Sequence, residues 1–155
     1  MAIRRSASGF TTTEIVIVIA IVAILAALAG PEMAQMVRRQ RVKTATFDLF
    51  SSLNLARSEA IKRNLVITMA PVEGDWSKGW RITDSNGHPV REQSGWPNLT
   101  MTGPGSVRFN SSGRVPPASG AASFSVTSPD VPPTSFRCVR LDLSGRAISQ
   151  EGPCP

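Results

Sequence analysis

The chain has 155 residues, enough for one ordinary domain with a modest core. Its 17 basic and 11 acidic residues give a formal net charge of +6, which favours acidic partners such as anionic lipid or nucleic acid. The two cysteines form no CxxC pair and are too few for a zinc site, and the sequence predicts no metal site and no cofactor.

A short basic leader and an apolar helix are predicted at the N-terminus. Residues 1–9 read MAIRRSASG, then FTTTE follows, and an unbroken apolar run extends from Ile15 to Ala29. The segment 10–30 is long enough to span the hydrocarbon core of a bilayer as a helix, and the basic flank places the N-terminus on the cytoplasmic side. Removal of the leader would leave 15 basic against 11 acidic residues, a net charge of +4.

Two other interpretations of this segment are an ordinary secretory signal and a plain signal anchor. The stretch Ala27-Leu28-Ala29 before Gly30 fits a small-x-small cleavage site. Against both stands Glu14, the only charged residue between Arg5 and Glu32. A carboxylate in an apolar run is costly unless it is paired, so Glu14 suggests a positive charge from another copy of the same kind of chain.

A second, amphipathic half of the helix is predicted over residues 31–64. Gly30-Pro31 should kink or locally melt the helix, because proline removes a donor and clashes with the preceding turn. The apolar stripe of the second half, which would pack on a sheet, has the 3/4 spacing of a helix. It consists of Leu49, Leu53, Ala56 and Ala60, and Phe50 and Ile61 widen it.

The pattern changes to short strands after the helix, over residues 65–155. Runs with β-branched or aromatic residues occur at Leu65–Ala70, Gly79–Thr83, Val90–Gln93, Ser106–Asn110, Ala121–Thr127 and Ser135–Leu143. Asn86-Gly87 is a good hairpin signal. The order of elements predicts an α+β fold, in which a long N-terminal helix packs on a small antiparallel β domain.

The cysteines, Cys138 and Cys154, both lie late in the chain. In an exported protein an even number of cysteines favours a disulfide, worth roughly 3 kcal/mol in the chain-entropy model for a loop of this length. In a reducing compartment they would be a pair of free thiols.

No catalytic constellation is recognisable, and the sequence predicts no enzyme. The single histidine, His88, stands in a polar turn and is interpreted as structural or solvated. Trp76, Trp80 and Trp96 could stack on single-stranded nucleic acid, but anchoring the core or loops is the preferred interpretation.

The leader has a specific resemblance. Gly9-Phe10-Thr11-Thr12-Thr13-Glu14 followed by an apolar helix resembles the class III leader of type IV pilins and type II secretion pseudopilins. The resemblance implies that a prepilin peptidase cuts after Gly9 and methylates Phe10. It also implies that Glu14 offsets the terminal ammonium of a neighbouring subunit, and that Pro31 is the helix-breaking proline of many such pilins.

Four later motifs resemble the GspH/FimT family of minor pilins and pseudopilins. They are Ala56–Asn64, Gly79-Trp80, Phe109–Arg114 and Leu143–Arg146. The resemblance implies a pilin fold and a structural subunit that joins other major and minor pilins, at the tip, to initiate a pilus. It implies a single-pass inner-membrane protein with its C-terminal domain in the periplasm, which then enters an extracellular pilus. A type II secretion pseudopilin is the alternative.

DNA capture for natural transformation is a further alternative. Its candidate contacts are Arg114, Arg137, Arg140 and Arg146. DNA-binding members of the family share a C-terminal Gly-Arg-x-Arg motif, whereas this chain reads Gly145-Arg146-Ala147-Ile148 and lacks the second arginine. Arg137 and Arg140 would also lie on opposite faces of a regular strand, which argues against a single patch.

Overall fold

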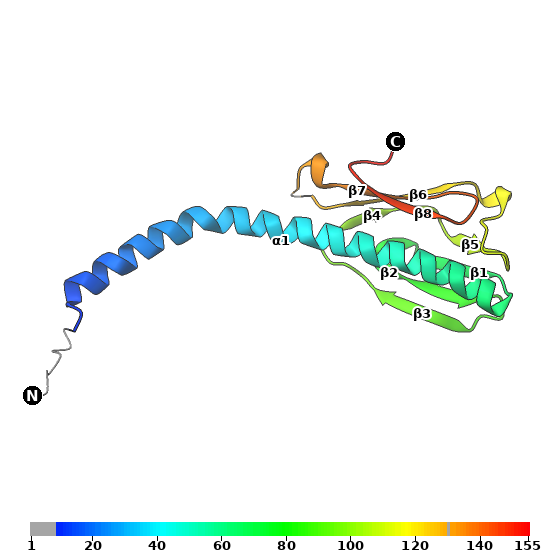
Figure 1. Cartoon of the computed structure of the whole chain (residues 1–155), viewed down its shortest axis with the longest axis horizontal. Coiled ribbons are helices and arrows are strands. Elements are labelled where there is room, and N and C mark those ends of the chain that lie inside the picture. Colours follow the sequence, from blue (N-terminus) through cyan, green and yellow to red (C-terminus); the bar gives the residue numbers. More distant parts are fainter. Residues whose placement is uncertain (1–8, 130) are drawn as a thin grey trace, which may run out of the picture. The chain divides into compact units, whose positions relative to one another are not determined.

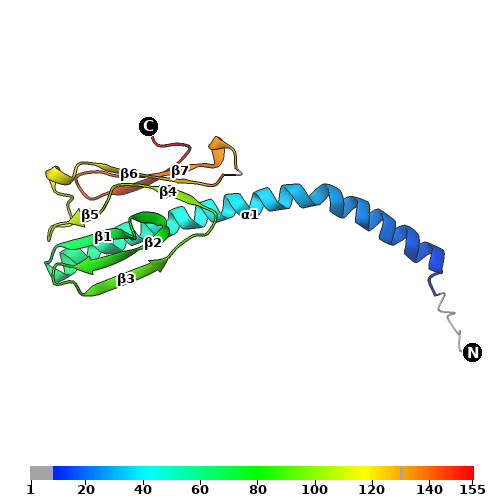
Figure 2. The same ribbon diagram turned by 180° about the vertical axis from the view of Figure 1, so that it is seen from behind.

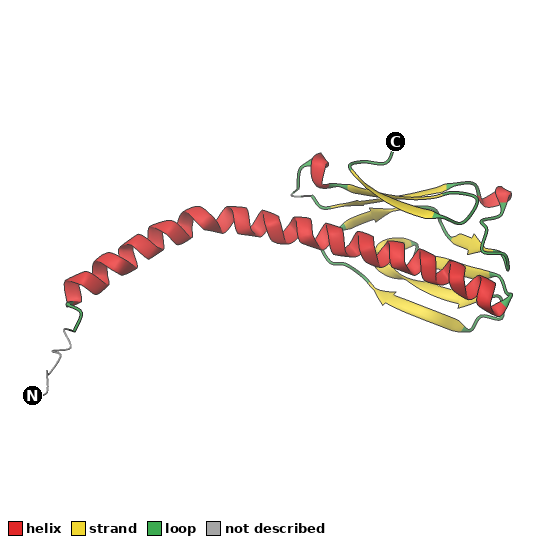
Figure 3. Ribbon diagram, in the orientation of Figure 1, coloured by secondary structure: helices red, strands yellow, loops and turns green. Residues whose placement is uncertain are grey.

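The computed structural model describes residues 9–129 and 131–155 of the chain, so most of the predicted leader lies outside it. The chain divides into two compact units, Met1–Met36 and Val37–Pro155. A long helix, α1 (Thr12–Arg63), comes first, and every strand in the described residues follows it (Figure 3). This agrees with the helix predicted for residues 10–64, apart from its ends.

The start of α1 is capped by Thr11 of the leader motif. The backbone N–H of Glu14 donates to the Thr11 side-chain oxygen at 3.3 Å and to its carbonyl at 3.1 Å. Thr-x-x-Glu is the sequence pattern of a capping box, and a carboxylate in the first turn also interacts favourably with the helix dipole. Glu14 therefore has a local role in starting the helix, separate from any role in assembly.

The first unit exposes apolar side chains on all sides of its helix. The large apolar side chains between Ile15 and Leu25 are each 50–62% exposed. A surface of this size needs lipid or other protein chains to cover it. Among the described residues no single helix is long and apolar enough to cross a membrane. The two stretches of α1 on either side of residues 28–31, Thr12–Ala27 and Glu32–Arg63, would be so when taken together, by length and composition only.

The backbone stays helical through Gly30 and Pro31, so the proline does not end α1. A kink at Pro31 remains a prediction. The helix ends at Arg63, where Asn64 adopts a left-handed backbone conformation with φ 54°. The Leu65 N–H then donates to the Ala60 carbonyl, which closes the last turn.

The second unit is built on the remaining part of α1. One stripe of this part is fully buried, with the 3/4 spacing that makes a helix face. Its apolar members are Val42, Ala45, Leu49, Leu53, Ala56 and Ala60. The predicted stripe is buried here and Phe50 packs against it, but Ile61, which was predicted to widen the stripe, is 52% exposed because it lies in the last turn of α1.

The first sheet has the strand order β3-β2-β1-β5, and all its pairs are antiparallel. Its strands are β1 (Ile67–Val72), β2 (Asp75–Asp84), β3 (Pro89–Ser94) and β5 (Val107–Phe109). Asn86-Gly87 turns β2 into β3, with Gly87 at φ 82°, as the sequence predicted. Figures 1 and 2, which view the molecule from opposite sides, show α1 running over β1 and β2.

The second sheet has the order β4-β6-β7-β8 and is also antiparallel. It contains β4 (Thr100–Thr102), β6 (Ala122–Thr127), β7 (Arg137–Leu141) and β8 (Ala147–Glu151). Two short 3-10 turns, η1 (Pro117–Ser119) and η2 (Pro133–Ser135), lie in the proline-rich loops before β6 and β7. The α+β class is confirmed, but β4 and β8 lie outside the predicted strand runs.

Trp76 joins the two sheets, Trp80 is buried, and Trp96 is partly buried against the same core. Trp80 is fully buried and Trp76 is 3% exposed, with its ring edge-on to Phe124 at 4.9 Å between centroids. The Trp76 indole N–H donates to the Pro104 carbonyl at 2.8 Å. These contacts place Trp76 and Trp80 in the core, in agreement with the preferred interpretation.

Candidate functional site

The four arginines proposed for DNA contact do not form one patch. In β7, Arg137 is half-buried beside Phe47 and Phe50 of α1, and its guanidinium lies 2.5 Å from the Glu151 carboxylate. Arg140 is exposed on the other face of the same strand. The sequence predicted this separation, because side chains three residues apart on a regular strand point to opposite faces.

Arg114 and Arg146 end two turns of the same construction. In each turn an Asn or Asp side chain, Asn110 or Asp142, accepts the N–H of the arginine four residues later, at 2.9 and 3.0 Å. A backbone hydrogen bond also closes each turn: the N–H of Asn110 donates to the Arg114 carbonyl, and the N–H of Asp142 donates to the Arg146 carbonyl.

The glycines of these two turns account for the Gly-Arg pairs of this chain structurally. Gly113 and Gly145 have φ values of 70° and 79°, which a side chain rarely adopts. A Cβ on Gly145 would lie 2.0 Å from the Gly113 carbonyl oxygen, so the turns are in close contact. The Val115 N–H donates to the Leu143 carbonyl and joins the turns further. The motif is therefore accounted for by turn geometry and packing.

A disulfide folds the C-terminal segment back over the second sheet. Cys138 of β7 and Cys154 are joined, with 5.1 Å between their Cα atoms. The Gly152 N–H donates to the Phe136 carbonyl at 2.7 Å, and the Cys154 sulfur lies 3.2 Å from the Phe124 carbonyl oxygen. The tail is thus held against β6 and β7.

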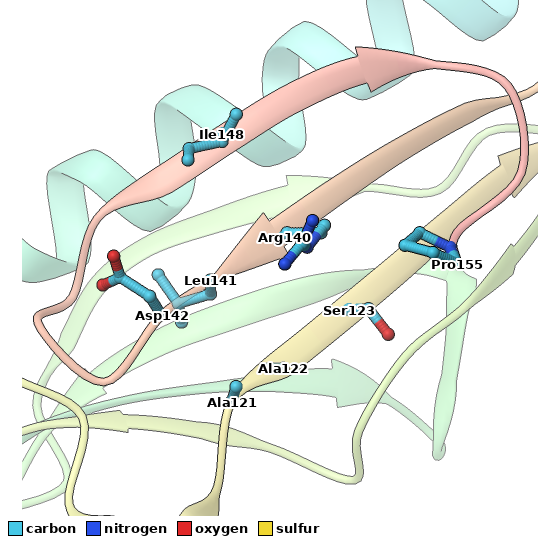
Figure 4. A pocket seen from close by; sticks show the side chains of 8 residues that line it. All are labelled: Ala121, Ala122, Ser123, Arg140, Leu141, Asp142, Ile148 and Pro155. Atoms are coloured by element: carbon cyan, nitrogen blue, oxygen red, sulfur yellow. The ribbon is translucent and has the colours of Figure 1, made fainter.

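A cavity of about 290 Å³ lies beside this tail, over the second sheet (Figure 4). Ser123, Arg140 and Ile148 line it and are directly opposite one another on β6, β7 and β8. All three side chains are exposed, so this row belongs to the solvent face of the sheet. Pro155, from the tail, forms a further wall.

The charged side chains that line the cavity are those of Arg140 and Asp142. Asp142 lines the cavity, and the Ser144 hydroxyl that donates to its carboxylate at 2.6 Å lowers the pKa of that carboxyl, as does the Arg146 N–H. No ion pair of 4.0 Å or less is found for Arg140 among residues 9–129 and 131–155. The Arg140 guanidinium can therefore accept an external anion.

The structure also ties the end of α1 to the β2–β3 hairpin. The Asp84 side chain is 4% exposed, and its carboxylate accepts the N–H groups of Asn86 and His88 at 2.9 Å. Burial raises the pKa of Asp84, but these hydrogen bonds and the imidazole of His88 outweigh it and lower the pKa overall. Arg63 lies 3.8 Å away. His88 is thus a structural neighbour of Asp84.

A family model described as type II transport protein GspH matches residues 45–145. The chain belongs to the GspH family. The sequence motifs had suggested the same family. The matched residues run from the buried part of α1 to the second Gly-Arg turn. No curated protein sequence matches the chain.

Solved structures of minor pilins and pseudopilins resemble this GspH-family chain. The type IV minor pilin FimU of Pseudomonas aeruginosa PAO1 is 25% identical, with a TM-score of 0.62 over 74% of this chain and 90% of FimU. The minor pseudopilin EpsH of the Vibrio cholerae type II secretion system is 10% identical, with a TM-score of 0.58 over 76% and 98% of the two chains. The pilin fold is therefore confirmed.

Sequence reasoning identified the arginines and cysteines of this region but missed the cavity. The row Ser123–Arg140–Ile148 requires the register of three strands, and β8 was not predicted. Within the described part of the chain, no group of three or more His, Cys, Asp and Glu side chains could hold a metal ion.

Proposed function

We propose that this GspH-family chain is a minor type IV pilin that co-assembles with other pilins, near the tip, and helps to initiate the pilus. The observation that carries the proposal is the apolar surface of α1 between Ile15 and Leu25, where every large side chain is at least half exposed, in a chain of the GspH family. Such a surface is suited first to lipid and then to the packed helices of a filament.

Processing at the leader is part of this proposal. We propose that a prepilin peptidase cuts after Gly9 and methylates Phe10, which leaves a positively charged terminus close to Glu14 of a neighbouring subunit. A lone ammonium and a lone carboxylate in hydrocarbon are each costly, and pairing relieves both. Pairing of this kind would set the axial position of each incoming subunit.

Mass spectrometry of the mature protein tests the processing. We expect the N-terminal peptide to begin at a methylated Phe10. A start at Gly30 would show that the segment is an ordinary secretory signal and would remove the pilin assignment of the leader.

Filament incorporation tests the assembly role. Glu14→Ala should still give a membrane-inserted, folded protein, but the protein should be lost from sheared surface filaments. Thr12→Ala is a matched control, because it lies in the same exposed turn and carries no charge. Equal incorporation of the Glu14→Ala variant and the native chain would contradict the proposal.

A type II secretion pseudopilin is the second candidate, favoured by the description of the matching family model. The higher identity to FimU, 25% against 10% for EpsH, favours the pilus. Deletion of the gene separates the two: loss of surface pili with normal protein secretion supports the pilus, and the reverse supports the secretion system.

The DNA-receptor alternative has less support, because Arg137 is paired with Glu151 and faces α1, away from Arg140. Affinity for DNA depends on several phosphates contacted together, with a strong dependence on salt. A mobility-shift assay of the full chain with duplex DNA at physiological ionic strength tests it. A salt-sensitive shift that Arg146→Gln weakens would restore this alternative.

A further inference from the structure

We propose that the cavity around Arg140 binds a single carboxylate with an adjoining apolar group, as presented by an acidic side chain of a neighbouring pilin subunit. The identity of the partner rests on the proposed function, whereas carboxylate binding by the cavity does not. The two can therefore fail separately.

The floor of the cavity offers three kinds of contact in one row. Ser123, Arg140 and Ile148 are cross-strand partners, and directly opposite residues on a sheet have their Cβ atoms about 5 Å apart. The guanidinium can form two parallel hydrogen bonds to one carboxylate, and the hydroxyl can donate a third. Ile148, 47% exposed, provides an apolar surface for the carbon chain next to that carboxylate.

The wall of the cavity is built by the disulfide. Cys154 is bonded to Cys138, two residues before Arg140 on the same strand and therefore on the same face. This bond carries Pro155 to the rim, where Figure 4 shows it beside Arg140 and Ser123. The disulfide thus shapes a concave site on what would otherwise be a flat sheet face.

The charges favour one carboxylate over a polyanion. The cavity has one cation, Arg140, and the Asp142 carboxylate also lines it. DNA binding requires several cations at the spacing of phosphates, and the ionised Asp142 opposes a ligand with many negative charges more strongly than it opposes a single carboxylate held by Arg140. The mature chain would carry a net charge of +4, which favours an acidic neighbour.

Nuclear magnetic resonance of the ¹⁵N-labelled full chain in maltoside micelles tests the inference. The probe is N-acetyl-leucine, which carries one carboxylate and one apolar group, and N-acetyl-leucinamide is its neutral counterpart. We expect saturable shifts of the Arg140 Nε–H and of the Ser123 and Ile148 amides with the acid. The same shifts should be absent with the amide.

Three variants distinguish binding in the cavity from non-specific attraction to any exposed positive charge. Arg140→Gln should weaken binding of the acid about tenfold, as loss of a charge-assisted hydrogen bond implies. Arg108→Gln is the matched control, because Arg108 is an exposed strand residue in the other sheet. Pro155→Gly, which keeps the disulfide, should weaken binding less than Arg140→Gln.

Three results would overturn the inference. The first is equal shifts from the acid and the amide. The second is an affinity for the acid that Arg140→Gln and Arg108→Gln change equally. The third is a twelve-nucleotide single-stranded DNA that saturates the Arg140 resonance at lower concentration than the acid, which would assign the cavity to phosphate. Pilus counts do not enter this test, so its failure would leave the minor-pilin proposal standing.

Discussion

The two parts of α1 use one secondary structure for opposite purposes. Between Ile15 and Leu25 the large side chains are at least half exposed, whereas the stripe from Val42 to Ala60 is fully buried by the chain's own strands. The first part has apolar residues on every side, and the second has them at 3/4 spacing. A helix that is apolar all round needs cover from outside the chain, and an amphipathic helix can be covered by its own domain.

The strongest test of this contrast is a pair of large-to-small substitutions. Leu49→Ala should lower the free energy of unfolding of the second unit by about 2–5 kcal/mol, because it leaves a cavity where a fully buried side chain was removed. Ile19→Ala, at a position 62% exposed, should leave it unchanged. Urea unfolding in micelles, followed by the fluorescence of buried Trp76 and Trp80, measures both. Equal destabilisation by the two variants would break the contrast.

The disulfide provides a second test of the contrast between the two parts of the chain, because the cross-link lies wholly in the second unit. Replacing both Cys138 and Cys154 by serine should lower the free energy of unfolding by roughly 3 kcal/mol, since a loop of 16 residues is no longer closed in the unfolded chain. Thermal melting with and without reductant measures this. Membrane insertion of the first unit should be unaffected, and a defect in insertion would show that the units are coupled.

Acid should weaken the second unit through Asp84. Its pKa is lowered in the folded state, so it contributes stability above its ordinary value of 3.8, and this contribution is lost as the pH falls below that value. Asp84→Asn should therefore be less stable than the native chain at pH 7, and the difference should shrink towards pH 3. Urea midpoints at the two pH values measure it, and a difference that widened in acid would contradict this account.

A small effect is expected at Phe47, an exposed apolar residue in the amphipathic part of α1. Its side chain is 65% exposed, so Phe47→Ser should change the free energy of unfolding by less than about 0.5 kcal/mol. The same urea titration measures it. A larger loss would show that Phe47 is covered by the domain in solution and belongs with the buried stripe.

Signals between residues close in the sequence determined much of this protein. Helical spacing predicted α1 nearly to its ends, and Asn86-Gly87 predicted the turn between β2 and β3. Strand alternation separated Arg137 from Arg140, which already weakened the case for a DNA-binding patch. These features depend on backbone periodicity and turn chemistry, which act over a few residues and are therefore visible in a sequence.

Other features were decided only by tertiary structure. β4 has three residues, too few for alternation to be recognised, and β8 (Ala147–Glu151) has no β-branched or aromatic run beyond Ile148. The strands divide into two sheets because of contacts between distant segments, such as Trp76 with Phe124. The cavity needs the register of β6, β7 and β8 and the folded-back Cys154. Pairing across such separations is set by the burial of the whole core, which no local pattern encodes.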